Sequence, residues 1–107
     1  MLKIQDDVIT LCGSIRFKDD FMREGERLTK LGYVVLMPSI WHYLSDSNLD
    51  EAETELKALL TVIHFKKILM SNTIHVINKR GYIGNQTAVE IVYASAFGLK
   101  ITYMEGR

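Results

Sequence analysis

The sequence predicts an α/β fold of three layers, in which helices cover both faces of a four-stranded parallel sheet. Short apolar segments that suit buried strands alternate along the chain with longer segments whose apolar residues recur every three to four positions. The short segments lack the polar alternation of a strand with one face in water, so both faces of the sheet should be covered. Right-handed crossovers leave few topologies for such a chain, and we predict the strand order 2-1-3-4.

The N-terminal third predicts a strand followed by a helix. Residues 8–12 are β-branched or apolar and precede Gly13, which indicates a buried strand. Between Phe17 and Leu31, apolar residues recur at helical spacing among charged ones, and Gly32 is typical of a helix end. The chain therefore begins with one strand-and-helix unit.

A second strand and a long loop follow. Residues 33–37 form another apolar run, which Pro38 ends, and the stretch 39–48 is irregular. Trp41 and Tyr43 in this stretch are suited either to stacking on a base at the rim of a crevice or to packing and dimer contacts. We expect a strand and then a long loop.

The second half of the chain completes the alternation. Residues 50–53 resemble a capping box, and apolar residues at helical spacing continue to 69, which predicts a second helix. The remaining expected elements are a third strand over 73–78, a third helix over 85–97 that stops at Gly98, and a fourth strand over 100–104.

Composition limits the function classes. With 107 residues, 48% of them hydrophobic and 24% charged, we expect one folded domain over residues 1–107 that needs no cofactor or metal for stability. Lys and Arg number 13 and Asp and Glu number 13, so the basic excess of a duplex nucleic-acid binder is missing. A balanced charge means that any anionic partner must be held locally.

Cysteine usage and the N-terminus predict a cytoplasmic protein. The single cysteine, Cys12, cannot form an intramolecular disulfide, which fits a reducing compartment. Asp6 and Asp7 stand where a signal peptide would carry apolar residues, and no apolar run approaches the ~18 residues of a membrane span. We therefore expect no membrane partner.

The predicted topology places a ligand crevice at the carboxyl ends of strands 1 and 3, where the chain reverses direction. Gly13, Ser14 and Arg16 follow strand 1 and offer a close-approaching backbone, a hydroxyl and a guanidinium suited to an anion. Asn78 ends strand 3 and leads into the second loop. The two loops face the same crevice.

A glycine turn leads from strand 3 into the third helix, through Gly84, Asn85, Gln86 and Thr87. A helix N-terminus with glycine before it can hold a phosphate or a carboxylate, although such turns often serve only as turns. The turn is neither a Walker loop nor a dinucleotide fingerprint. We predict that these residues bind the ligand.

Glu90 is the one charged residue between Gly81 and Leu99. A carboxylate in apolar surroundings must be paired, hydrogen-bonded or protonated. It lies one turn beyond Gln86 and Thr87, on the crevice side, where a nucleophile or charge stabiliser would act. An ion pair with Arg16, Lys66 or Lys67 that only ties the layers together would explain the same carboxylate.

Metal and triad chemistry are not predicted. His42, His64 and His75 lack metal-ligand spacing, so we expect core or surface roles for them. Ser14 and Cys12 have no histidine and acid partners evident in the sequence, which argues against a hydrolytic triad.

Four segments together resemble the nucleoside 2-deoxyribosyltransferase-like superfamily, in the manner of its small bacterial and phage-type members. They are CGSIR at 12–16, VIN at 76–78, GYIGNQTAVEIVYA at 81–94 and GLKI at 98–101. The resemblance implies a flavodoxin- or Rossmann-like sheet, a homo-oligomer, and cleavage or transfer at the N-glycosidic bond of a nucleoside or nucleotide. It implies Glu90 as nucleophile, with sugar or phosphate at Gly13, Ser14, Arg16 and the turn 84–87.

Two acids of the family's enzymes are missing. Their places fall near Lys66 and Gly84, and the departing base needs an acid that protonates it. Either Asp46, Asp50 or another loop residue takes this part, or the protein is a noncatalytic nucleotide-sensing module. A pure interaction protein is the third reading.

Overall fold

The computed structural model describes residues 3–39 and 51–106. The expected loop over 39–48, with Trp41, His42 and Tyr43, lies outside the described residues apart from Ser39. The acids suggested as proton donors, Asp46 and Asp50, lie outside them as well.

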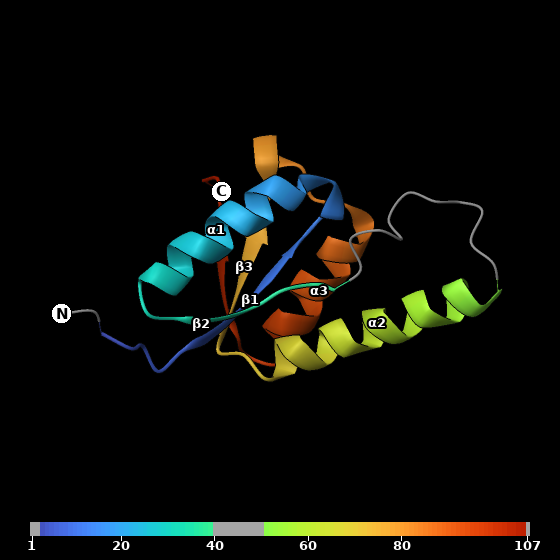
Figure 1. Ribbon diagram of the computed structural model, residues 1–107, viewed down its shortest axis with the longest axis horizontal. Helices are drawn as coiled ribbons and strands as arrows, with labels where there is room; N and C mark the ends of the chain where they lie inside the picture. Colours follow the sequence, from blue (N-terminus) through green and yellow to red (C-terminus); the bar gives the residue numbers. More distant parts are fainter. Residues whose placement is uncertain (1–2, 40–50, 107) are drawn as a thin grey trace.

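The sheet has four parallel strands in the order β2-β1-β3-β4, which confirms the predicted topology (Figure 1). Ile9 of β1 is in register with Val35 of β2 on one side and with Thr73 of β3 on the other. The strands are β1 (Val8–Gly13), β2 (Val34–Leu36), β3 (Thr73–Ile77) and β4 (Lys100–Tyr103).

In residues 3–39 and 51–106, three α-helices and two short 3-10 turns connect the strands. They are η1 (Ile15–Phe17), α1 (Lys18–Lys30), α2 (Glu51–Leu69), η3 (Lys79–Gly81) and α3 (Asn85–Ala96). Figure 1 shows α1 on one side of the strands and α2 and α3 on the other, which gives the three layers of a flavodoxin- or Rossmann-like fold.

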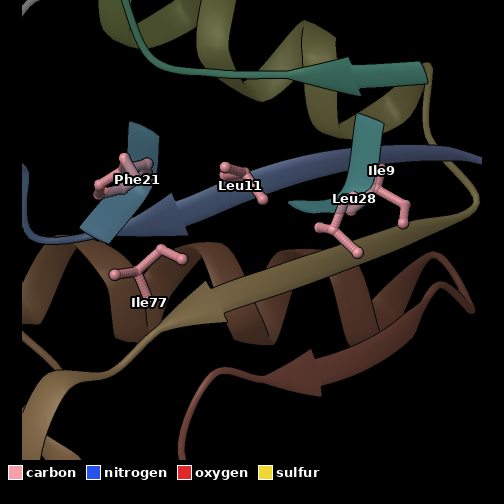
Figure 2. Packing of buried hydrophobic residues seen from close by; sticks show 5 residues of the cluster. All are labelled: Ile9, Leu11, Phe21, Leu28 and Ile77. Atoms are coloured by element: carbon pink, nitrogen blue, oxygen red, sulfur yellow. The ribbon is translucent and has the colours of Figure 1, made fainter. Parts of the chain in front are cut away.

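Each face of the sheet carries its own core. Figure 2 shows Leu11 of β1 and Ile77 of β3 packed with Phe21 and Leu28 of α1. The next residue of β1, Cys12, points the other way and packs with Ile74 and Val76, Ile68 of α2 and Ala94 of α3. This alternation explains why the strand segments are apolar throughout: both faces are buried.

Helix α3 carries one charged residue, Glu90; so little charge predicts packing on several sides, but the structure contradicts this prediction. Thr87, Glu90 and Ala94 face the interior, whereas Val89 and Val92 are 55% and 69% exposed. The helix buries one face only, and its charge-poor outer face meets solvent.

Within residues 3–39 and 51–106, no helix combines the length and the apolar character that crossing a membrane requires.

Candidate functional site

A pocket of about 360 Å³ opens at the carboxyl ends of β1 and β2, on the side of the sheet that α2 and α3 cover. Its walls come from four segments: 13–15 after β1, 38–39 after β2, one face of α2 between 57 and 64, and 84–90 at the start of α3. All the predicted site residues except Arg16 and Asn78 line it: Gly13, Ser14, Gly84, Asn85, Gln86, Thr87 and Glu90. In a doubly wound sheet this is the end at which ligands bind.

Gly13 allows β1 to end close to β3. Its φ is +153°, and a Cβ at this position would lie 2.7 Å from the backbone oxygen of Ile77. Only glycine fits without displacing the neighbouring strand. The turn that begins the pocket wall is therefore set by this residue.

The start of α3 presents backbone donors to the pocket. Gly84 is the N-cap, and no side-chain cap bond occurs there within the described residues. Ala88 donates its N–H to the oxygen of Gly84 at 2.9 Å, so the amides before it precede any intrahelical acceptor. Lys57 is also in the pocket lining, and a helix start and a lysine both suit an anion.

Glu90 lies in the pocket wall and is only 5% exposed. Gln86 donates from Nε2 to Oε2 of Glu90 at 3.4 Å, and Nε2 of His64 lies 3.6 Å from Oε1. The sequence suggests Arg16, Lys66 or Lys67 as its ionic partner; in the described chain the neighbouring basic side chain is His64 instead. Lys67 points elsewhere, with Nζ donating to the Met37 oxygen at 2.7 Å and to Ser39 at 2.9 Å.

Cys12 completes a group of three around His64. Its Sγ lies 3.6 Å from Nε2 of His64, and the thiol is fully buried. Burial, and after it the neighbouring Glu90 carboxylate, raise the pKa of the Cys12 thiol well above its usual range. The thiol is therefore protonated at neutral pH.

The expectation that Cys12 has no histidine and acid near it is wrong, because 52 residues of chain separate it from His64 and only the tertiary fold joins them. This Cys-His-acid arrangement does not make Cys12 a catalytic nucleophile. A nucleophilic thiolate needs a lowered pKa and access to substrate, whereas the pKa of Cys12 is raised and its side chain is buried.

His64 is the residue that the sequence prediction missed. It lies four positions before Ile68, so both face the sheet from α2 and both are buried. The available signal was a histidine within the buried stripe of a helix. That signal was ambiguous, since Leu59 and Val62 on the same helix are 56% and 53% exposed.

Arg16 lies outside this pocket, in a second hollow that Phe17, Lys79, Arg80 and Tyr82 also line. Its guanidinium stands 4.5 Å from the centre of the Tyr82 ring and donates to the Tyr82 hydroxyl at 3.3 Å. Its Nε donates to Ser14 Oγ at 3.1 Å. Arg16 therefore links the loop after β1 to the loop that contains Tyr82.

Asn78 is fully buried and joins the ends of β3 and β4. Its Nδ2 donates to the backbone oxygen of Glu105 at 3.2 Å, and its Oδ1 accepts the Glu105 N–H at 2.9 Å. These bonds use its amide within the fold, away from the pocket.

His75 takes the core position expected for it. Its Nε2 pairs with Oε1 of Glu24 at 2.8 Å and its Nδ1 with Thr102 Oγ1 at 2.7 Å. Bonds from Arg27, and to a smaller extent from His75, hold the pKa of Glu24 below its usual value.

Comparison of the chain with family models, curated proteins and solved structures gives no match. Fold and site therefore define its class: a three-layer α/β protein with a pocket at the carboxyl ends of its parallel strands.

Proposed function

We propose that this protein binds a nucleoside or nucleotide in the pocket and cleaves or transfers at its N-glycosidic bond, with Glu90 as nucleophile. One observation carries the proposal: Glu90 is a buried carboxylate in the wall of a pocket that also contains an uncapped helix start. The resemblance to the nucleoside 2-deoxyribosyltransferase-like superfamily supports the same role.

Different groups in the pocket lining suit the two parts of such a ligand. The amides of 85–87 and Lys57 favour a phosphate, and Glu90 favours the positive charge that develops on the sugar as the glycosidic bond breaks. Gln86 donates to the carboxylate and so restricts its rotation. Attack by Glu90 at C1′ would give a glycosyl ester that water or an acceptor base then resolves.

The departing base needs a proton. His64 lines the pocket, with Nε2 3.6 Å from Oε1 of Glu90, and we assign the donation of this proton to its imidazole. His64 would thus stand in for the acids that the family carries near Lys66 and Gly84.

A noncatalytic nucleotide-sensing module is the second candidate function. The same contacts of Glu90 with Gln86 and His64 favour it, since a carboxylate held in this way can serve to bind a ribose hydroxyl without reacting.

Base release separates the two functions. We expect free base from a panel of nucleosides and nucleoside monophosphates incubated with the full chain and analysed by chromatography. Saturable binding without free base would favour the sensing module, and the absence of both binding and release would favour an interaction protein.

A further inference from the structure

We infer that Cys12, His64 and Glu90 form a Zn²⁺ site at the inner wall of the pocket, and that zinc bound there withdraws Glu90 from the reaction. The second half of this inference rests on the proposed function. Zinc binding itself does not.

The donor atoms already have the spacing of a zinc site. Sγ of Cys12, Nε2 of His64 and a carboxylate oxygen of Glu90 all lie within 4.8 Å of one another. A tetrahedral Zn²⁺ with bonds of about 2.3 Å to sulfur and about 2.0–2.1 Å to nitrogen separates those two atoms by about 3.6 Å. The measured separation is 3.6 Å, and the separation from Nε2 to Oε1 is also 3.6 Å.

The kinds of donor select the metal. Thiolate, imidazole and carboxylate together form a set that Zn²⁺ accepts, whereas Mg²⁺ and Ca²⁺ prefer oxygen ligands. Three ligands from the protein leave one position of the tetrahedron open. His64 and Glu90 line the pocket, which gives the ion a path of entry and allows water to take that position.

The charge of the group favours a cation. Cys12 and Glu90 are both buried acids, and both lie against Nε2 of His64. One Zn²⁺ balances a thiolate and a carboxylate, so the group becomes neutral with both acids ionised. Binding displaces the thiol proton of Cys12 to solvent.

The unpaired nitrogen of His64 is a separate observation. Nδ1 is buried and has no hydrogen-bond partner among the described residues. In the tautomer with the proton on Nδ1, the Nε2 lone pair faces Cys12 and Glu90 and is open to a metal.

Cobalt tests the metal site directly. We expect the full chain, stripped with a chelator, to bind one Co²⁺ and to develop a near-ultraviolet thiolate-to-cobalt band with visible bands of four-coordinate cobalt. One equivalent of Zn²⁺ should abolish both. The band should be absent in Cys12→Ser, and cobalt binding should be at least about tenfold weaker in His64→Gln and Glu90→Gln.

Glu26→Gln is the matched control, because Glu26 is an exposed carboxylate paired with Lys30. It should bind cobalt as the wild type does. Melting curves of the stripped variants establish that each is folded, and Zn²⁺ should raise the melting temperature of wild type and Glu26→Gln only. A wild-type protein without a thiolate band, or with equal cobalt affinity in all variants, overturns the site.

Base release tests the regulatory half separately. We expect zinc to slow release by wild type and a chelator to restore it. Zinc binding with unchanged or faster release overturns the withdrawal of Glu90 while leaving the site intact. If stripped wild type releases no base but gives the cobalt band, the proposed function fails and the zinc site stands.

Discussion

At the residue scale, replacing Glu90 by glutamine removes the charge of the side chain and keeps its size. The side chain is 7% exposed, and its polar neighbours include Gln86, His64 and Cys12. A nucleophile requires the negative charge itself, whereas a structural carboxylate requires mainly its hydrogen bonds.

We therefore expect Glu90→Gln to lose orders of magnitude in base release at nearly unchanged melting temperature. The measurement is product chromatography beside a thermal melt, with Glu26→Gln as the control. A structural Glu90 would show the reverse, a loss of about 1–3 kcal/mol in unfolding free energy with unchanged release.

Glu24, which belongs to α1, makes the folding stability depend on pH. Its pKa lies below the ordinary value of 4.5, chiefly through the bond from Arg27 and then the bond from His75. The folded state thus favours the ionised form, so this contribution to stability is present above pH 4.5 and is lost as the pH falls through the folded pKa.

Denaturant unfolding of wild type and Glu24→Gln between pH 7 and pH 3 measures this contribution, and the difference between the two should shrink as the pH falls. A constant difference would mean that Glu24 acts through packing rather than charge.

At the scale of the elements, the strands were predictable and the inward face of α2 was not. Strands buried on both faces leave a continuous apolar run, and each predicted strand agrees with the structure to within one residue at each end. Helix α2 has apolar residues on more than one face: Leu59 is exposed while His64 is buried. Spacing alone therefore did not identify which face meets the sheet.

The candidate site also has a part that the sequence predicts and a part that it does not. Residues next to strand ends, such as Gly13 and Gly84, follow from topology. Glu90 contacts His64, and His64 contacts Cys12, so these contacts join three elements that are far apart in sequence. A single sequence carries no signal for such tertiary contacts.

The start of α3 and Lys57 predict a preference for phosphate. Nucleoside monophosphates should raise the melting temperature more than nucleosides do, and the difference should fall with salt and in Lys57→Ala. The sequence had suggested Arg16 as the cation, but Arg16 lies in the second hollow. Arg16→Ala is therefore the control and should keep the preference; the opposite pattern would place the phosphate in the second hollow.

At the scale of the whole molecule, the outer surfaces of α2 and α3 are where we expect the contact between copies in the homo-oligomer. Each has large apolar side chains in solvent: Leu59 and Val62 on α2, Val89 and Val92 on α3. Covering such groups with a second copy would remove them from water.

We expect light scattering to give a mass above that of one chain, and Val92→Asp to lower it without changing the melt of the dilute protein. Val34→Asp, at an exposed position of β2 on the edge of the sheet, is the control and should leave the mass unchanged. A single-chain mass for wild type at all concentrations would refute the oligomer.

Because Cys12 is completely buried, the reaction of its thiol with a reagent reports local opening of the protein. The chain has one cysteine, and its sulfur sits in the central strand behind α2 and α3. A thiol reagent can react only with molecules that have transiently opened this layer. The rate of labelling therefore measures how often the layer over Cys12 opens, and a ligand that binds in the neighbouring pocket should slow the labelling.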